Sequence, residues 1–564
     1  MRILLALLLL LLAASPATAQ DRPPDFVTVV FHQVVERQEE LESDAITTIE
    51  LIRFFDWLKG NGWTAISLDD LEAARTGAKA LPPKSILITF DDGYESVYAQ
   101  AYPLLLAYRY PAVVAVVGDW VAGAPGSMVR YGNKWLPRTR FLSWDEMREM
   151  TASGLVEIAS HSYALHETVQ ANPQGNMQPA AATWRYDPNT GTYEADAAYR
   201  LRIRSDLEAS RRQFAQELGK PPRALVWPFG RYTGPAMQAA KAAGFTYLFT
   251  LQHAPDRLDQ LDRIGRDYPV AADKLANIAT EIAFEPPKAD ALRIACLTLD
   301  RLAAAKGPDA QDAALGRMIE SVRALGVNTL VLDAQAALPT ADAPLGAVFF
   351  PTRLRPVAAD LLNRVVWQMR TRADVDAVYL RLPFAAARAA VSADVGALYA
   401  DLFRAVPADG LVLDASPELT AFGDDAADQP SSTRWDLSAR RNAANPDAEA
   451  WQAYRAAASI APNLRLMLTG KEAAARTRWP APLADVLLLP AGADPAQLQA
   501  AHWFEPRQSG RVALTLPADS PAAAMRAAQA QGATAFALCP GDAVLEDPAL
   551  LSHSFSAASY PLKP

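Results

Sequence analysis

Short apolar runs alternate with amphipathic stretches from residue 26 to about residue 286. Short runs rich in β-branched residues are typical of buried strands, and apolar residues spaced three and four apart predict helices. Strands that alternate with helices predict an α/β fold with a mostly parallel sheet, closed as a distorted (β/α) barrel. We expect strands at 27–31, 64–67, 86–90, 112–117, 156–160, 224–227 and 247–250, and helices at 48–60, 96–108, 144–153, 199–218 and 235–243.

A second alternation follows Glu285-Pro286-Pro287-Lys288, a stretch that is typical of a linker. Its eight strand-like runs predict a C-terminal (β/α)8-like barrel, although a doubly wound open sheet gives a similar pattern. A chain of 564 residues is too long for one core, so we expect domains at 26–286 and 290–564. The strands are expected at 293–297, 329–333, 377–382, 410–414, 464–468, 486–489, 512–516 and 534–538, and the helices at 311–325, 357–371 and 521–531.

The first residues are typical of a secretory signal peptide. Met1-Arg2 precedes an apolar run of Leu and Ala, and Ala17-Thr18-Ala19 provides a cleavage site. The run is too short for a comfortable membrane span, so a signal peptide at 1–19 is favoured over an uncleaved anchor. No Cys stands near the site to carry a lipid. We therefore expect a periplasmic protein that is exported by cleavage of its leader.

The net charge and the two cysteines bear on the partners of the chain and on its covalent bonding. The formal net charge of −9 argues against nucleic acid as a partner, because phosphate binding requires a basic face. The two cysteines, Cys296 and Cys539, each lie in an apolar strand-like run. A disulfide is permitted outside the cytoplasm, and buried free thiols are equally consistent with the sequence.

Titratable residues follow three of the predicted strands. Asp91 and Asp92 follow the run at 86–90, His161 and His166 follow the run at 156–160, and His32 follows the run at 27–31. One Asp and two His suit Zn²⁺ or a similar divalent ion and leave positions open for water and substrate, while the second Asp can act as a base. An ordinary turn and unrelated histidines are the alternative. Three of the chain's six His at strand ends favour a metal-assisted hydrolase.

Longer motifs resemble the carbohydrate esterase family 4 polysaccharide deacetylases, and among them the exported poly-β-1,6-N-acetyl-D-glucosamine N-deacetylases of biofilm-forming bacteria. The matching stretches are Thr89-Phe90-Asp91-Asp92-Gly93-Tyr94, Ala101-Tyr102-Pro103-Leu104-Leu105, Ala115-Val116-Val117-Gly118-Asp119-Trp120, the run from Ser153 to Ser162, Ala171-Asn172-Pro173-Gln174-Gly175-Asn176, and Leu225-Val226-Trp227-Pro228-Phe229-Gly230. The resemblance implies a NodB-like deacetylase domain followed by a glycoside-hydrolase-like barrel. The long loop at 169–198 is expected to line the substrate groove.

The resemblance also implies roles for individual residues. Asp92, His161 and His166 would bind a divalent metal, which is Zn or else Ni, Co or Fe. Asp91 would be the general base and His32 the general acid. Tyr94 would either present a backbone N–H to the oxyanion or line the sugar site with its side chain. The other side chains that would line the sugar site are Trp227, Pro228 and Phe229, for which simple packing is the alternative.

Two departures from the family pattern stand out. Many members carry an Arg two residues before the Pro of the Pro-aromatic-Gly motif, where this chain has Val226. The Arg that orients the base is therefore missing or supplied from elsewhere, and Asp267 is the candidate to stand in for it. In the second half, 348–356 and 365–372 look like the family's barrel. The His-Asp-Asp stretch of that barrel is replaced by Asp414-Ala415-Ser416-Pro417-Glu418, with Asp424-Asp425 nearby. Because glycoside hydrolysis needs two placed carboxylates, we expect a degenerate hydrolase.

The sequence thus predicts an exported metal-dependent N-deacetylase that acts on β-1,6-linked N-acetylglucosamine polymer. We expect a monomer whose partners are that polysaccharide and an outer-membrane export porin. A bifunctional deacetylase and glycosidase is one alternative, and a polysaccharide-binding scaffold with little turnover is another. Peptidoglycan and chitin are the alternative substrates, against which the Asn172–Asn176 loop and the two-domain layout count.

Overall fold

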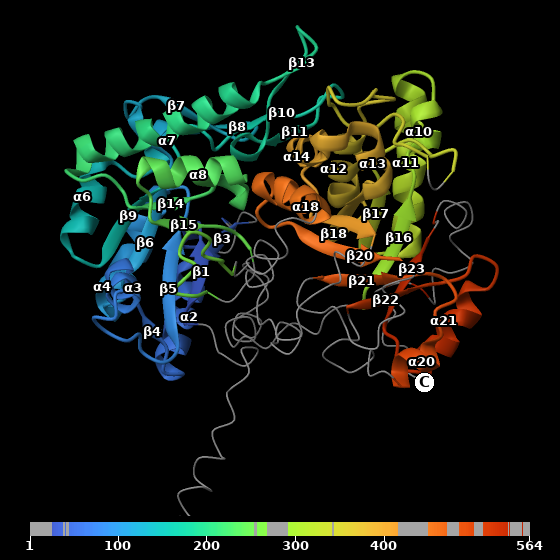
Figure 1. Cartoon of the computed structure of the whole chain (residues 1–564). Coiled ribbons are helices and arrows are strands. Elements are labelled where there is room, and N and C mark those ends of the chain that lie inside the picture. The colour runs from blue at the N-terminus through green and yellow to red at the C-terminus, as the bar shows by residue number, and fades with distance from the viewer. Residues whose placement is uncertain are drawn as a thin grey trace, which may run out of the picture.

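The computed structural model describes residues 25–37, 40, 44–252, 256–267, 291–340, 343–414, 449–470, 484–500, 511–539, 541 and 555. They form two α/β bodies that lie side by side (Figure 1). The predicted signal peptide at 1–19 and the predicted linker at 285–288 lie outside the described residues. Within the described part of the chain, no helix combines the length and apolar character that crossing a membrane requires.

The N-terminal body is built on a 7-stranded sheet with the order β1-β5-β6-β9-β14-β15, in which β4 also pairs with β5. All neighbouring strands are parallel. The segment from Ile264 to Asp267 joins the two edges, because Ile264 bridges to Phe249 in β15 and Asp267 bridges to Val29 in β1. The predicted distorted barrel is therefore confirmed. Its strands are β1 (Val27–Phe31), β4 (Thr64–Ala65), β5 (Ser85–Phe90), β6 (Ala112–Val116), β9 (Val156–Ser160), β14 (Ala224–Val226) and β15 (Tyr247–Phe249).

The helices around this sheet start where the sequence offers caps. Thr47, Ser67 and Ser143 each form a capping box with the acidic residue three positions later, which satisfies the first free N–H groups of the helix. The predicted helix at 96–108 begins as a π-helical turn (Val97–Ala101). The helices are α2 (Thr48–Gly60), α3 (Leu68–Arg75), α4 (Tyr102–Tyr108), α5 (Gly118–Ala122), α6 (Trp144–Ala152), α7 (Asp196–Leu218) and α8 (Gly234–Ala243).

Four two-stranded sheets lie outside the main sheet of the first barrel. The pair β2 (Gln33–Val35) and β3 (Ala45–Thr47) is parallel, and the pair β7 (Met128–Tyr131) and β8 (Lys134–Pro137) is an antiparallel hairpin. Two further antiparallel pairs lie inside the predicted long loop. They are β10 (Thr168–Gln170) with β11 (Met177–Pro179), and β12 (Tyr186–Asp187) with β13 (Thr192–Tyr193).

The C-terminal body is a closed barrel of eight parallel strands, which decides between the two predicted architectures. Gly410 is required in its interior, because a Cβ there would lie 2.2 Å from the ring of Tyr379. The strands are β16 (Arg293–Leu297), β17 (Thr329–Asp333), β18 (Ala377–Arg381), β19 (Gly410–Asp414), β20 (Arg465–Thr469), β21 (Val486–Leu489), β22 (Val512–Thr515) and β23 (Ala535–Leu538). The helices are α10 (Asp300–Ala304), α11 (Pro308–Leu325), α12 (Leu362–Arg372), α13 (Phe384–Val391), α14 (Val395–Ala405), α18 (Glu449–Ile460), α20 (Pro495–Ala500) and α21 (Pro521–Gln529).

Two open points in this barrel are settled by the structure. Cys296 and Cys539 form a disulfide with a Cα–Cα distance of 4.8 Å, next to the seam where β23 pairs with β16. The helix predicted at 357–371 starts only at Leu362, because Val357 is engaged in a bridge with Val348.

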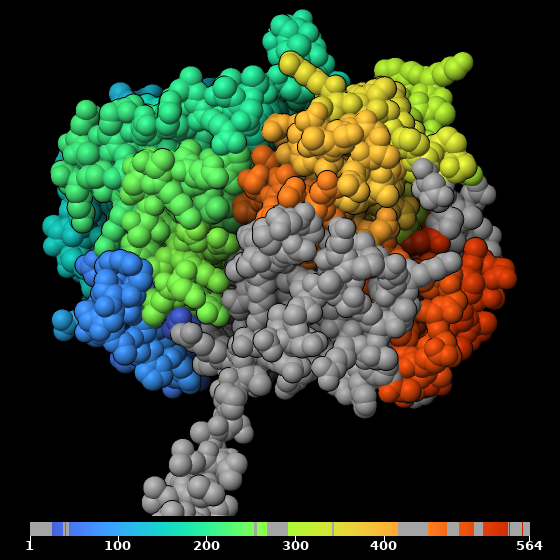
Figure 2. All heavy atoms as spheres, in the orientation of Figure 1, coloured from blue at the N-terminus to red at the C-terminus, as the bar shows by residue number. Residues whose placement is uncertain are grey.

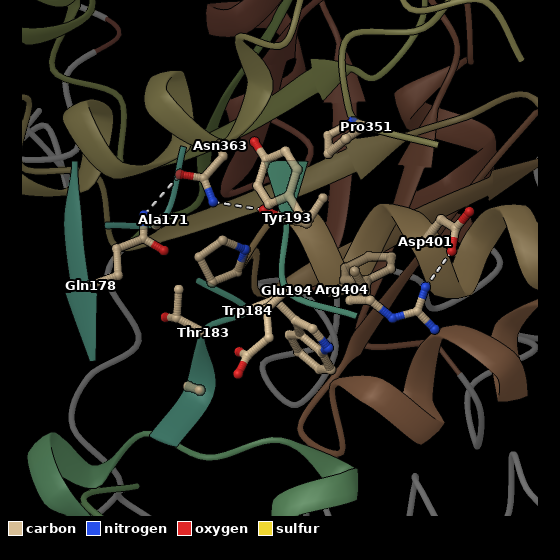
Figure 3. A pocket seen from close by; sticks show the side chains of 14 residues that line it. Ala171, Gln178, Thr183, Trp184, Tyr193, Glu194, Pro351, Asn363, Asp401 and Arg404 are labelled. Atoms are coloured by element: carbon tan, nitrogen blue, oxygen red, sulfur yellow. Dashed lines mark hydrogen bonds and ion pairs between the residues drawn. The ribbon is translucent and has the colours of Figure 1, made fainter. Parts of the chain in front are cut away.

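The long loop at 169–198 packs against the second barrel. The side-chain oxygen of Asn363 in α12 accepts hydrogen bonds from Asn172 at 2.7 Å and from Gln178 at 2.9 Å, and all three side chains are buried. A cavity of about 100 Å³ lies beside this network (Figure 3). These two amides thus dock the loop onto the second body, and the lining of a substrate groove by this loop stays a prediction. In Figure 2 the green and orange surfaces meet without a gap in the upper half of the view.

Candidate metal centre

The three predicted metal ligands lie together at the carboxyl ends of β5 and β9. Asp92 Oδ1 is 3.4 Å from His161 Nε2 and 3.3 Å from His166 Nε2. One ligand atom from each residue lies within 4.8 Å of the others. Ligands bound about 2.0–2.1 Å from a tetrahedral metal are separated by about 3.3–3.4 Å, so the spacing of Asp92 to each imidazole suits such an ion.

The protonation pattern also fits a cation. His161 Nδ1 lies 2.8 Å from the carbonyl oxygen of Val226, which can only accept, so Nδ1 carries a proton and Nε2 is the nitrogen whose lone pair a metal ion would take. That lone pair faces Asp92 Oδ1, a buried oxygen that no hydrogen bond from the described residues reaches. Two acceptors facing each other in a buried site need a positive charge between them. The residues present therefore fit a divalent metal.

The charges of these groups depend on each other. Burial alone would raise the pKa of Asp92, but the adjacent imidazoles of His166 and His161 hold it well below its usual range. Burial alone would lower the pKa of His161, and the carboxylates of Asp92 and Asp91 offset this and raise it. Asp92 is thus a carboxylate at neutral pH, as a ligand must be.

A sharp turn gives Asp91 and Asp92 different surroundings. Asp92 and Gly93 both adopt left-handed backbone conformations, with φ of 70° and 68°. A Cβ at Gly93 would lie 3.0 Å from the side chain of Val116, so the close approach and the positive φ both favour glycine there. The N–H of Leu142 donates to the Gly93 carbonyl at 2.8 Å and fixes the turn.

The loop that carries both histidines is held from α7. The carboxylate of Asp206 accepts the backbone N–H of Tyr163 at 2.9 Å and that of Ala164 at 2.7 Å. The hydroxyls of Ser160 and Ser210 are 2.7 Å apart, which ties the end of β9 to the same helix. No pattern in the sequence marks Asp206, because it lies 40 residues after His166 on a helix face without a motif.

Asp91 is paired with Arg266. The two guanidinium nitrogens of Arg266 lie 2.7 and 2.8 Å from the two oxygens of Asp91, and both side chains are buried. Arg266 also donates to the Thr250 carbonyl at 3.1 Å and to the Thr89 hydroxyl at 3.2 Å. The expectation that Asp267 replaces the family's Arg is therefore corrected: the neighbouring Arg266 contacts the base. Burial would raise the pKa of Asp91, but Arg266 and His161 lower it.

A buried carboxyl group fixes the segment that carries Arg266. Asp256 Oδ1 accepts the N–H of Gly265 at 2.8 Å, and Asp256 Oδ2 accepts the hydroxyl of Thr28 at 2.7 Å. Burial raises the pKa of Asp256 well above its usual range. The irregular segment at 264–267 is thus tied to β1.

His32, the predicted general acid, follows a strand that neighbours the one before Asp91. It follows β1 directly, and the register places Phe31 opposite Phe90, so His32 and Asp91 leave neighbouring parallel strands at the same end. The N–H of Asp91 donates to the Phe31 carbonyl at 2.8 Å. The half-buried His32 is also close enough to contribute to the electrostatics of both Asp91 and Asp92.

The predicted sugar-site side chains divide into one exposed ring and three buried groups. Phe229 is 42% exposed, and its ring centroid lies 4.5 Å from that of His166. Trp227 is fully buried and stacks on Tyr232, and Pro228 is buried too. The ring of Tyr94 is 3% exposed and stacks on Phe141. The prediction of a sugar wall is therefore corrected for the side chains of Tyr94, Trp227 and Pro228, which pack in the interior.

One further side chain reaches the centre without having been predicted. The hydroxyl of Tyr131 in the β7–β8 hairpin donates to Asp92 Oδ2 at 2.9 Å. Burial and the charge of Asp92 raise the pKa of Tyr131, so the phenol stays protonated and acts as a donor. A Tyr-Gly-Asn-Lys turn between alternating residues could have predicted the hairpin, but not this contact.

Both parts of the chain match family models. A family model described as polysaccharide deacetylase matches residues 78–248, and one described as hypothetical glycosyl hydrolase family 13 matches residues 299–392. The chain is 33% identical over 358 residues to the poly-β-1,6-N-acetyl-D-glucosamine N-deacetylase of Escherichia coli K12. This match covers 64% of the chain and 53% of that relative, so the chain spans about half the length of the relative.

Two solved structures are also similar. A de-N-acetylase from Aggregatibacter actinomycetemcomitans is 35% identical with a TM-score of 0.43, and the match covers 45% of this chain and 99% of that one. The BpsB deacetylase domain from Bordetella bronchiseptica is 39% identical with a TM-score of 0.40, and the match covers 44% and 98%. Residues 78–248, which contain Asp91, Asp92, His161 and His166, thus match the polysaccharide deacetylase family.

Proposed function

We propose that the chain is a metal-dependent N-deacetylase that removes acetyl groups from β-1,6-linked N-acetylglucosamine polymer. One observation carries this proposal: the group formed by Asp92, His161 and His166 lies beside Asp91, a second carboxylate held by Arg266. A hydrolase of this kind needs one carboxylate to bind the ion and a second, unliganded carboxylate to accept a proton. This centre supplies both.

The residues divide the reaction between them. A divalent ion bound by Asp92, His161 and His166 would supply Lewis acidity toward the acetamide carbonyl and make a water more acidic. Asp91 accepts the proton of the attacking water, and Arg266 keeps Asp91 charged and oriented for this step. His32, at the end of the neighbouring strand β1, donates a proton to the departing amine. The N–H of Tyr94 is the candidate donor to the oxyanion.

The proposal also specifies the polymer, the location of the protein and the metal. The named relative from Escherichia coli is a poly-β-1,6-N-acetyl-D-glucosamine N-deacetylase, which supports the same polymer here. The leader-like pattern at 1–19 supports export to the periplasm, where an outer-membrane porin would be the partner in biofilm polysaccharide secretion. Zn is the ion that the two imidazoles and one carboxylate favour, with Ni, Co or Fe as alternatives.

The second barrel is proposed to lack glycosidase activity. At the carboxyl ends of its strands, Asp333 in β17 is ion-paired with Arg381 in β18 at 2.5 and 2.9 Å, which occupies both oxygens. Asp414 ends the next strand, β19. The predicted acidic residues Glu418, Asp424 and Asp425 lie outside the described residues. Since Arg381 engages both oxygens of Asp333, this residue is a poor candidate for one of the two placed carboxylates of a glycosidase.

The proposal is tested by acetate release from β-1,6-linked N-acetylglucosamine oligomers, with β-1,4-linked oligomers as the control substrate. We expect release from the β-1,6 oligomers that stops after chelation and returns when Zn²⁺ is added. Release that is insensitive to chelator would overturn the metal-dependent mechanism. Equal rates on both linkages would overturn the substrate assignment alone. Shortening of a partly deacetylated polymer would overturn the proposed inactivity of the second barrel.

A further inference from the structure

The two oxygens of Asp92 have different partners. Oδ1 faces Nε2 of His161 and His166, whereas Oδ2 accepts the hydroxyl of Tyr131 at 2.9 Å. A carboxylate that accepts a hydrogen bond on one oxygen is held against rotation about its last bond. The other oxygen then keeps a fixed direction. In metal sites, such partners of the ligands set ligand orientation and basicity.

Tyr131 is itself fixed by aromatic packing. Its ring centroid lies 5.2 Å from that of Trp120, 5.9 Å from that of Tyr94 and 6.4 Å from that of His166. The ring is stacked on His166 with an interplanar angle of 21°. Tyr131 thus contacts one ligand through its hydroxyl and lies against a second with its ring. A side chain held in this way gives its hydroxyl little freedom to leave Asp92.

The hairpin that carries Tyr131 is tied to the turn that carries Asp92. The buried guanidinium of Arg138, just after β8, donates to the carbonyls of Phe141, Val121 and Leu142 at 2.8–2.9 Å. Leu142 in turn donates its N–H to the carbonyl of Gly93. The hydroxyl of Tyr131 and the carboxylate of Asp92 are therefore positioned by one continuous network.

A second carboxylate lies near the same hydroxyl. Asp44 Oδ2, just before β3, is 3.3 Å from the Tyr131 oxygen, compared with 2.9 Å for Asp92 Oδ2. A phenol has a single proton to donate, and the shorter distance assigns it to Asp92. The hydroxyl thus supplies its hydrogen bond to the ligand and not to the loop.

We propose that Tyr131 is a positioning residue that holds Asp92 as a one-oxygen ligand, so that the remaining positions of the ion stay open for water and the acetamide oxygen. The inference rests on the proposed function, because it concerns the same metal centre. It goes beyond the ligand set, since it assigns a residue that touches neither the ion nor the substrate. Without the hydroxyl, Asp92 Oδ2 would be free to turn toward the ion.

The test is the Zn²⁺ affinity of Tyr131→Phe, measured on the full chain by competition with a chromophoric chelator. We expect binding that is weaker by about 10- to 100-fold, the range found when such partners of metal ligands are removed. With Co²⁺ in place of Zn²⁺, the absorption spectrum should shift toward that of a higher coordination number. Excess Zn²⁺ should restore most of the acetate release, because the reacting groups are unchanged.

Tyr98→Phe is the matched control. Its hydroxyl also donates to a carboxylate, Glu149 at 2.8 Å, on the exposed surface, and its loss should leave Zn²⁺ affinity unchanged. The melting temperatures of the metal-free proteins establish that each variant is folded. Equal Zn²⁺ affinity and an unchanged Co²⁺ spectrum in Tyr131→Phe would overturn this inference and leave the proposed function standing. A wild-type protein that binds no Zn²⁺ would overturn the proposed function and this inference with it.

Discussion

The guanidinium of Arg266 forms two parallel hydrogen bonds with the carboxylate of Asp91, at 2.7 and 2.8 Å, in the interior of the first barrel. Bidentate pairs of this kind fix the plane of the carboxylate as well as its charge. The pairing separates Asp91 from Asp92, which is held by imidazoles and a phenol. Two adjacent aspartates in the sequence thus have different chemical environments.

Removing this pairing should change the pH dependence of the reaction. Arg266 lowers the pKa of Asp91, and Asp91 must be deprotonated to accept a proton, so activity is lost as the pH falls through that pKa. In Arg266→Gln the pKa of Asp91 rises, and we expect the acidic limb of the kcat/KM profile to move up by about one to three pH units.

Arg263→Gln serves as the control for this experiment. Arg263 lies three residues away and pairs with Asp262 near the surface, so its pH profile should match that of the wild type. An acidic limb that stays in place in Arg266→Gln would show that Arg266 does not control the ionisation of Asp91.

Replacing Asp206, which holds the loop between His161 and His166, should weaken metal binding. Asp206 accepts two backbone N–H groups from the residues between His161 and His166. Asp206→Asn keeps one acceptor oxygen and turns the other into a donor, so we expect Zn²⁺ affinity to fall by about 10-fold, as for other groups that orient ligands. Isothermal titration with Zn²⁺ measures this directly. Glu208→Gln, on the same helix but exposed, should bind as the wild type does, and equal affinity in both variants would count against the role of Asp206.

The contact between the two bodies should depend on pH through Asp360. Tyr193 donates to this carboxylate, and burial raises its pKa to about 6. The folded state then binds more protons than the unfolded state between pH 3.8 and about 6, so the contribution of Asp360 to stability falls as the pH rises through that window. The contribution of Asp360 to the free energy of unfolding is lower at pH 7 than at acidic pH by at most about 3 kcal/mol.

The melting temperatures of wild type and Asp360→Asn at pH 4.5 and pH 7 measure this effect. We expect the melting temperature of the wild type, relative to that of Asp360→Asn, to be higher at pH 4.5 than at pH 7. Asp145→Asn, which removes an exposed carboxylate, should show no such pH dependence. A constant difference between wild type and Asp360→Asn across this range would contradict the assignment.

The exposed ring of Phe229 should contribute to substrate binding. It stands beside His166 at 4.5 Å between ring centroids, and an aromatic face of this kind can stack on a sugar. For Phe229→Ala we expect KM to rise by about 3- to 10-fold, which corresponds to about 1 kcal/mol, with little change in kcat. Leu106→Ala, an exposed apolar residue on α4, is the control. A fall in kcat without a rise in KM would assign Phe229 to the orientation of His166 instead.

The grouping of the candidate ligands could be predicted from the sequence because parallel strands end at a common edge. Asp91, Asp92, His161 and His32 each follow a predicted strand of the same sheet, so topology alone places them close together. Arg266 lies on an irregular segment that bridges β15 and β1 without forming a strand, and no periodicity marks such a segment.

Other residues show why the hydrophobic pattern of the sequence does not predict the burial or the contacts of single side chains. Trp227 and Phe229 are both aromatic and two residues apart, yet one is fully buried and the other is 42% exposed. Phe229 also adopts a left-handed conformation, with φ of 57°, which a sequence does not reveal. The amides of Asn172 and Gln178 are similarly polar in the sequence and buried in the structure, because their partner Asn363 is about 190 residues away.

The central claim is that Asp92 binds the ion and Asp91 moves the proton, and paired variants test it most directly. Bound Zn²⁺ and the rate of acetate release from β-1,6-linked N-acetylglucosamine oligomers are measured for Asp91→Asn and Asp92→Asn. We expect Asp91→Asn to keep its Zn²⁺ and lose activity by about 10²- to 10⁴-fold, and Asp92→Asn to lose both. Full activity in Asp91→Asn, or unchanged Zn²⁺ binding in Asp92→Asn, would contradict the account.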